Sequence, residues 1–168
     1  MKKNSYLQTG FTLVEMVIVI LIMSALAVTA YARISQIDTQ ARLAALQSFK
    51  ASVLSVATMA KGVCLSDAQC QSTQSQGTPS TTIDGNTIYF TYGYPVGWLA
   101  DNEDGSGSLH QLLDPGKFVI QPSLSSLNRA TYFLSGARDM DHCKLEYSIA
   151  GGTPSASGIT VNIDSSGC

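Results

Sequence analysis

The stretch Thr9-Gly10-Phe11-Thr12-Leu13-Val14-Glu15 opens the most apolar part of the chain. Between Phe11 and Ala32 the 22 residues include one charged side chain, that of Glu15. As an α-helix this run is about 33 Å long, enough to cross a hydrocarbon core of roughly 30 Å. A short segment with Lys2 and Lys3 precedes it. A positive segment ahead of an apolar one predicts membrane targeting, with the N-terminal side in the cytoplasm.

The carboxylate of Glu15 conflicts with this apolar surrounding. An unpaired charge inside a membrane costs several kcal/mol. No Lys or Arg lies between residues 11 and 32 to pair with it. The sequence therefore predicts that Glu15 needs a cationic partner from outside the apolar run.

The run Gly10-Phe11-Thr12-Leu13-Val14-Glu15, continued by Met16-Val17-Ile18-Val19-Ile20-Leu21-Ile22, resembles the type IV prepilin signature. The resemblance implies that a prepilin peptidase cuts between Gly10 and Phe11 and methylates the new amine of Phe11. It also implies that Glu15 attracts the N-terminal amine of a neighbouring subunit, which supplies the missing cation. A desolvated pair between chains favours one axial register more than it adds net stability.

Three other interpretations of the apolar run remain open. Ala25-Leu26-Ala27 and Ala30-Tyr31-Ala32 both fit the cleavage site of an ordinary secretory signal peptide, although the run exceeds the usual 7–15 residues and contains an acid. A plain transmembrane anchor with an incidental Glu15 is the second alternative. The third is a buried core helix of a soluble protein, which the flanking lysines disfavour.

The rest of the chain predicts an α+β fold, with the long helix packed on a small antiparallel β-sheet. We expect a leader at 1–10, a transmembrane or filament-core helix at 11–32 and a globular domain at 33–168. Because residues 11–61 contain neither Pro nor Gly, the helix should continue to Lys61 and stop at Gly62. Beyond the membrane, steps of three and four residues predict one packing stripe. Its members are Ile34, Ile37, Ala41, Ala45, Phe49, Val53, Val56, Ala60 and Val63.

Residues 62–86 are rich in Ser, Thr, Gln and Gly and are expected to form a loop, followed by the sheet at 87–168. β-Branched and aromatic residues predict a strand at 87–92, with shorter strands at 117–121 and 131–135 and a helical turn at 109–113. The alternating segments 144–149 and 159–163 predict a closing hairpin.

Four cysteines lie beyond the targeting segment, at Cys64, Cys70, Cys143 and Cys168. An even number in an exported domain indicates two disulfides. Three connectivities are possible; we favour Cys64–Cys70 with Cys143–Cys168. The second bond would staple the outer ends of the predicted hairpin, and its spacing resembles the C-terminal disulfide region of pilins. Zinc is disfavoured because no C-x-x-C pair is present.

The sequence shows no recognisable catalytic motif, so we expect no enzyme activity, no cofactor and no metal. His110 and His142 lie outside any nucleophile or metal motif. The segment Asp101–Gly107 combines acids with glycines, but the EF-hand frame fails at its first and twelfth positions, so a surface turn is favoured over an irregular Ca²⁺ site. A formal net charge of −2 gives no reason to expect nucleic-acid binding.

An aromatic cluster lies between residues 89 and 98. It comprises Tyr89, Tyr92, Tyr94 and Trp98. Such rings could form a sugar-binding patch, but their spacing of two favours packing of some of them under the sheet.

The resemblance implies a structural subunit that polymerises through its N-terminal helix into a type IV pilus for surface attachment. Its expected partners are copies of itself, a prepilin peptidase, the pilus assembly machinery and, before assembly, the inner membrane. The mature chain would then lie in an extracellular filament. The strings at 25–30 and 92–95 are most similar to mannose-sensitive haemagglutinin pilins. Pseudopilins of type II secretion share the signature and are the first alternative, ahead of a conventionally secreted binding protein.

Overall fold

A computed structural model describes residues 11–68, 70, 78–99, 104–150 and 158–168, without the side chains of residues 32 and 35. The chain divides into two compact units, Met1–Gln40 and Ala41–Cys168. One helix, α1 (Leu13–Ser66), contributes residues to both. The leader expected at residues 1–10, including Gly10, lies outside the described residues.

Helix α1 passes through Gly62 and ends at Ser66, so the end predicted at Lys61 is wrong. A Cβ added at Gly62 would meet nothing within 4 Å, so the glycine has no special packing role. A glycine inside a helix costs only about 1 kcal/mol relative to alanine. Ala60 and Cys64, four residues apart, are both buried on one face of the helix. Their burial keeps this turn helical beyond the glycine.

In the first unit, α1 leaves its apolar side chains uncovered. Among the described residues it is the one helix long and apolar enough to cross a membrane, and none of its most apolar 18-residue window is buried. Ile34 and Ile37, which the predicted stripe placed on a packing face, are 65% and 63% exposed. The described residues of this unit therefore form no core among themselves.

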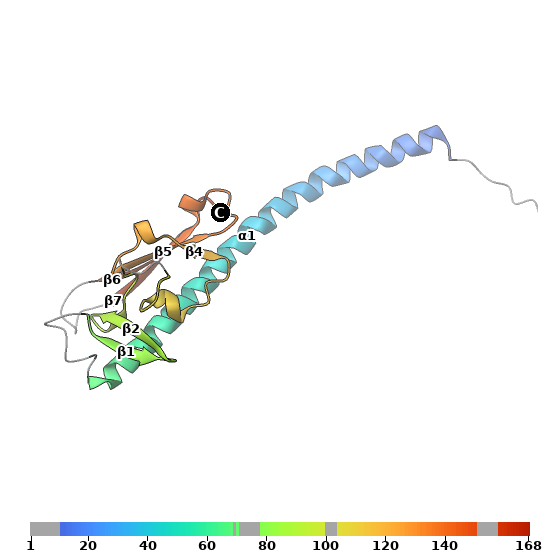
Figure 1. Cartoon of the computed structure of the whole chain (residues 1–168). Helices are drawn as coiled ribbons and strands as arrows, with labels where there is room; N and C mark the ends of the chain where they lie inside the picture. Colours follow the sequence, from blue (N-terminus) through green and yellow to red (C-terminus); the bar gives the residue numbers. More distant parts are fainter. Residues whose placement is uncertain (1–10, 69, 71–77, 100–103, 151–157) are drawn as a thin grey trace, which may run out of the picture. The chain divides into compact units, whose positions relative to one another are not determined.

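The second unit contains two antiparallel sheets where one was predicted (Figure 1). The first sheet consists of β1 (Ser80–Ile83), β2 (Asn86–Thr91) and β3 (Tyr94–Pro95), paired in that order. The second consists of β4 (Phe118–Ile120), β5 (Arg129–Leu134), β6 (Lys144–Ala150) and β7 (Gly158–Asp164), also in chain order. The described residues also include three 3₁₀ turns. Turn η1 (Leu109–Leu112) lies between the two sheets in the chain, η2 (Pro122–Leu124) between β4 and β5, and η3 (Met140–His142) between β5 and β6.

Strand β1 lies inside the segment that was predicted to be a loop. Ile83 pairs with Asn86 across a two-residue turn of Asp84 and Gly85, whose φ angles are +49° and +81°. Positive φ at both turn positions is typical of the type I′ hairpin, for which Asp-Gly is a favoured pair. The polar composition of residues 62–86 concealed this local hairpin signal. The connection between β6 and β7 lies outside the described residues.

The main core joins the C-terminal part of α1 to the second sheet. Phe49 stacks on Phe118 of β4 with ring centroids 4.1 Å apart, and meets Tyr132 of β5 edge-on at 5.2 Å. The buried face of the helix comprises Leu46, Phe49, Val53, Ala57, Ala60 and Cys64. The stripe was thus correct at Phe49, Val53 and Ala60, which are buried, and its members Ala45 and Val56 are partly buried against the same core. It missed Leu46 and Ala57, which are fully buried beside them. Of the aromatic cluster, Tyr94 and Trp98 are buried, whereas Tyr89 is exposed.

Both disulfides have the favoured pairing. Cys64 and Cys70 are joined across Cα atoms 5.2 Å apart, at the end of α1. Cys143 and Cys168 are joined across 4.9 Å and link the start of β6 to the segment after β7. In the chain-entropy model, closing a 25-residue loop stabilises a fold by about 3–4 kcal/mol.

His110 is a partly buried imidazole beside this core. Its ring centroid lies 6.2 Å from that of Trp98 and 5.8 Å from that of Tyr132. The buried Nδ1 of His110 and the hydroxyl of Tyr132 have no hydrogen-bond partner among the described residues. Burial lowers the pKa of His110 below its ordinary 6.5. The folded domain therefore favours the neutral imidazole.

We expect Phe49→Ala to destabilise the second unit by about 3–5 kcal/mol, because it removes both ring contacts and leaves a cavity. Urea unfolding of the full chain in micelles, followed by circular dichroism, measures this effect. Met59→Ala on the exposed face of the same helix is the control and should change stability by less than about 0.5 kcal/mol. Equal losses in the two variants would contradict the assignment of the core face.

The stability of the second unit should fall as the pH drops from 7.5 to 5. Since the folded pKa of His110 is lowered, the unfolded chain binds a proton in this range that the folded chain does not, which favours unfolding. His110→Phe should flatten the pH dependence measured by urea unfolding. The carboxyl of Asp164 does not interfere, because its pKa is lowered from 3.8 to about 2 by folding, so its stabilising contribution is lost only as the pH falls below about 4. An unchanged slope in the variant would show that His110 is not the titrating group.

Candidate functional site

The candidate site is the beginning of α1, where Glu15 lies in the first helical turn. The backbone N–H of Glu15 donates to Oγ1 of Thr12 at 3.3 Å. The same hydroxyl donates to Oε2 of Glu15 at 3.4 Å. Thr12, immediately before the helix, and Glu15, three residues later, thus have the spacing of a capping box. The Thr-x-x-Glu pattern of residues 12–15 is visible in the sequence and could have predicted this cap.

This position changes how the charge of Glu15 is accommodated. A negative charge in the first turn interacts favourably with the partial positive charge at a helix N-terminus, by about 0.3–1 kcal/mol. The hydroxyl of Thr12 supplies one hydrogen bond to the carboxylate. Both effects are smaller than the several kcal/mol needed to place an unpaired carboxylate in hydrocarbon. No described Lys or Arg forms an ion pair with Glu15. A cationic partner is still required if this turn is desolvated.

The predicted new N-terminus, Phe11, lies four residues before Glu15 in the sequence. Phe11 is 69% exposed and precedes Thr12, so its amide nitrogen is only one residue from the capping position. Cleavage before Phe11 would turn that nitrogen into an amine. Gly10, on the other side of the predicted cut, lies outside the described residues.

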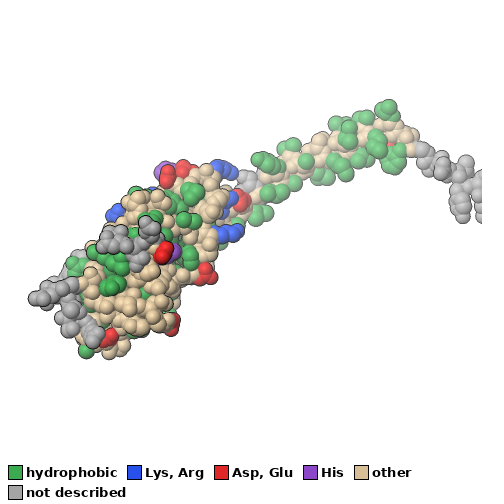
Figure 2. Space-filling view, viewed as in Figure 1, with side chains coloured by type: hydrophobic (Ala, Val, Ile, Leu, Met, Phe, Trp, Pro, Cys, Tyr) green, Lys and Arg blue, Asp and Glu red, His purple; other side chains and the backbone are tan. Residues whose placement is uncertain are grey.

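An apolar surface follows the first turn along α1. Figure 2 shows hydrophobic side chains along the N-terminal part of α1. Its large exposed members are Leu13, Val14, Met16, Val17, Ile18, Val19, Ile20, Leu21, Ile22, Met23, Leu26, Val28 and Tyr31. Soluble monomeric proteins rarely expose a contiguous apolar patch larger than a few hundred Å². This surface needs lipid or another apolar surface to cover it.

The second unit offers no comparable chemical centre in its described part. No group of three or more His, Cys, Asp or Glu side chains there could hold a metal. Asp101 to Glu103, part of the possible Ca²⁺ segment, lie outside the described residues, so that possibility remains a prediction.

The exposed His142 has a local partner. Its Nδ1 lies 3.2 Å from Oδ2 of Asp164. The hydroxyl and N–H of Ser166, donating to Oδ1 at 2.7 and 3.1 Å, are the main reason the pKa of Asp164 is lowered to about 2; the contact with His142 lowers it further. These contacts tie the segment after β7 to η3, beside the Cys143–Cys168 bond, and do not resemble a catalytic arrangement.

Comparison with known proteins identifies one family feature. The family model described as the prokaryotic N-terminal methylation motif matches residues 6–31. No match was found among the curated proteins or the solved structures. The match includes Phe11, Thr12 and Glu15 together with the exposed apolar surface of α1. The chain therefore carries the N-terminal methylation signal of type IV pilins and pseudopilins, joined to an α+β domain consistent with a pilin-like fold.

Proposed function

We propose that this protein is a structural subunit of a type IV pilus. It is inserted in the inner membrane as a prepilin and then polymerises through the N-terminal part of α1 into a surface filament for attachment. The observation that carries the proposal is the methylation motif at residues 6–31 on a helix whose apolar side chains are not covered by any described part of the chain.

In this proposal a prepilin peptidase cuts the bond between Gly10 and Phe11 and methylates the amine of Phe11. The amine is a cation within an otherwise apolar layer. In the membrane, the first turn of α1 holds the carboxylate of Glu15 through Thr12. In the filament, the Glu15 carboxylate of one subunit meets the amine of another. Removing one member of a buried ion pair costs about 3–5 kcal/mol, so the pair opposes any packing that leaves either charge alone.

Burial of the apolar part of α1 would drive the polymerisation. Lipid is as apolar as these side chains, so transfer from lipid into a helix bundle gains close packing more than hydrophobic free energy. Each subunit would use one surface to contact the next and a different surface to contact the previous one. Such a heterologous contact repeats without closing and produces a helical fibre.

A pseudopilin of a type II secretion system is the second candidate, because the same N-terminal motif occurs in both classes. The two candidates differ in the phenotype of a deletion. Loss of long surface filaments would favour the pilin. Intact filaments with blocked release of exported proteins would favour the pseudopilin.

The mature chain should begin at Phe11 and carry one extra methyl group on its amine. It should gain four hydrogens on reduction, because the structure contains two disulfides. Intact mass spectrometry with N-terminal fragmentation, on reduced and non-reduced samples, tests both points. A chain that starts after Ala27 or Ala32 would instead identify an ordinary secretory signal peptide and overturn the proposal.

Glu15→Ala should leave cleavage and methylation intact but strongly reduce filament yield, because the amine of the neighbouring subunit would be buried without its partner. Filaments sheared from cells and quantified by immunoblot provide the measurement, and Glu15→Gln tests whether charge rather than size is needed. Asp141→Ala, which removes one exposed acid of the second unit, is the matched control. Normal filament yield from Glu15→Ala would exclude the amine pairing.

A further inference from the structure

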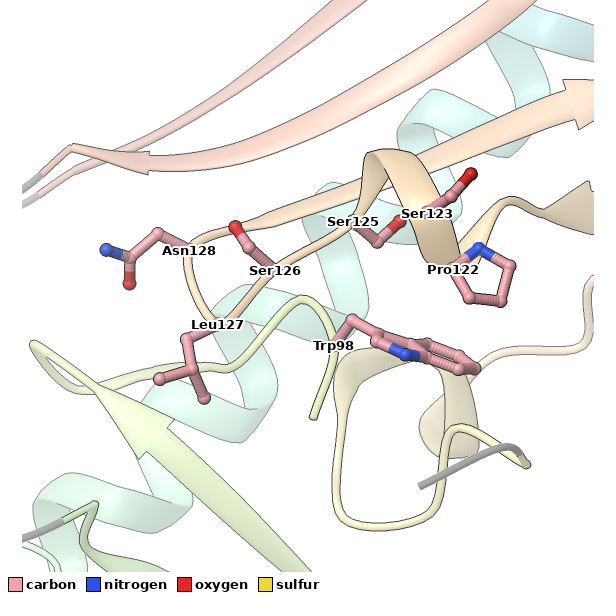
Figure 3. Close-up of a pocket in the computed structure, with 7 residues that line it drawn as sticks. All are labelled: Trp98, Pro122, Ser123, Ser125, Ser126, Leu127 and Asn128. Carbon is pink, nitrogen blue, oxygen red and sulfur yellow. The ribbon is translucent and has the colours of Figure 1, made fainter. Parts of the chain in front are cut away.

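A cavity of about 630 Å³ lies in the second unit, beside the turn that leads into β5 (Figure 3). Its volume is in the range of small-molecule sites, roughly 300–1,000 Å³. Figure 3 shows its residues in an arc, with Leu127 and Asn128 at one end and Trp98 and Pro122 at the other. Ser123, Ser125 and Ser126 lie between these ends.

The backbone around this cavity is held by hydrogen bonds between two segments far apart in the sequence. The N–H groups of Gly97 and Trp98 donate to the carbonyls of Leu127 and Ser126, at 2.8 and 2.9 Å. Ser126 and Arg129 exchange two further backbone hydrogen bonds, which close the turn. A Cβ at Gly97 would lie 2.3 Å from the carbonyl of Arg129. The close contact between the backbones of these two residues therefore requires glycine at position 97. The walls are therefore preformed, which reduces the ordering cost of binding.

The polar side chains of the cavity are of two kinds: some already form hydrogen bonds within the protein, and others do not. Ser125 Oγ donates to the carbonyl of Gln121 at 2.8 Å and accepts from the N–H of Thr131 at 3.0 Å. Ser123 Oγ accepts from the Gln121 amide at 3.1 Å. By contrast, the Ser126 hydroxyl and the Asn128 carboxamide have no hydrogen bond to other described residues. A hydroxyl and a carboxamide can each donate and accept, which matches the hydroxyl groups of a sugar.

The chemistry of the remaining lining limits the class of ligand. None of the lining residues in the described part of the chain carries a charge, so a phosphate or carboxylate ligand would find no ionic partner. Pro122 and the half-exposed Leu127 supply apolar walls. Trp98 is only 4% exposed, so it forms an apolar floor and not a projecting platform. This combination suits a compact neutral molecule that has apolar C–H faces and hydroxyl edges.

We propose that this cavity, which lies between Trp98 and the Ser125–Asn128 turn, binds a neutral hexopyranoside. Ser126 and Asn128 form hydrogen bonds to the hydroxyl groups of the sugar. The site lies wholly in the second unit and involves no residue of the N-terminal helix. It adds a recognition function to the proposed structural role and does not depend on it.

Trp98 is the sole tryptophan of the chain, so its fluorescence reports directly on this cavity. The full-length chain in a zwitterionic detergent without a sugar headgroup should be titrated with glucose, galactose, N-acetylglucosamine and lactose. At about 10 mM sugar a complex with a millimolar Kd is mostly occupied. We expect a saturable fluorescence change with at least one of these sugars. Glucose 6-phosphate should bind more weakly than glucose or not at all.

Ser126→Ala and Asn128→Ala should each weaken the binding by about fivefold, the effect of one neutral hydrogen bond. Asn162→Ala, at an exposed position of β7, is the matched control and should leave the Kd unchanged. Saturation-transfer NMR on the same samples detects a sugar that binds without changing the fluorescence.

Three outcomes would overturn the proposal. One is the absence of binding of all four sugars in both measurements. Another is binding with the same Kd in the Ser126 and Asn128 variants as in the unsubstituted chain. The third is equal binding of glucose 6-phosphate, which would contradict a site selected for neutral ligands.

Discussion

An apolar helical surface that the described residues do not cover is the constraint on which the rest of this structure depends. The N-terminal half of α1 exposes its large aliphatic side chains, and none of its most apolar window is buried. In water this surface would cause association, because its removal from solvent is favourable by roughly 25 cal/mol per Å². This surface therefore needs lipid or another apolar surface to cover it, and the methylation motif at residues 6–31 is consistent with a membrane-anchored chain.

The position of Glu15 limits how this requirement can be met. At the first turn, capped by Thr12, the carboxylate is partly compensated within its own chain. In the proposed function, local compensation of this kind would lower the cost of keeping the subunit in a membrane before assembly. It leaves most of the desolvation cost in place, so a cation from a neighbour still has a large effect on the preferred register. The same side chain thus serves a capping role in the monomer and a proposed pairing role in the polymer.

The second unit is stabilised by a different set of interactions, formed among residues 41–168. Phe49, Phe118 and Tyr132 join α1 to the second sheet, and the disulfides close the end of the helix and the final hairpin. These core contacts do not involve the exposed turns of the unit. The turn at Ser125–Asn128 is instead fixed by backbone hydrogen bonds to Gly97 and Trp98, which leave two side chains available.

Local patterns in the sequence were sufficient for several features of this protein. Hydrophobic length with flanking lysines predicted the long N-terminal helix, and strict alternation predicted β6 and β7. The position of Glu15 in the Gly-Phe-Thr-Leu-Val-Glu run indicated the processing signal. The helix, the two strands and the processing signal each depend on residues that are close together in the sequence. Such residues determine the periodicity of an element, its local charge and its match to a peptidase site. Local signals also misled in two places. Gly62 suggested the end of α1, but the burial of Cys64 keeps the helix going to Ser66. The polar composition of residues 62–86 suggested a loop, but the Asp84-Gly85 turn forms a hairpin that includes β1.

Tertiary structure decided which side chains meet across long sequence separations. No local pattern shows that Leu46 is covered while Ile34 and Ile37 are not, because the partner surface comes from β4 to β6. Contacts between distant segments also decide three other features. These are the division into two sheets, the partial burial of His110 beside Tyr132, and the cavity between Trp98 and Asn128. The sequence alone determined that the chain has a membrane-length helix with a processing signal. Packing between distant segments determined where the domain has its core and where it offers a binding surface, because burial depends on the whole chain and not on nearest neighbours.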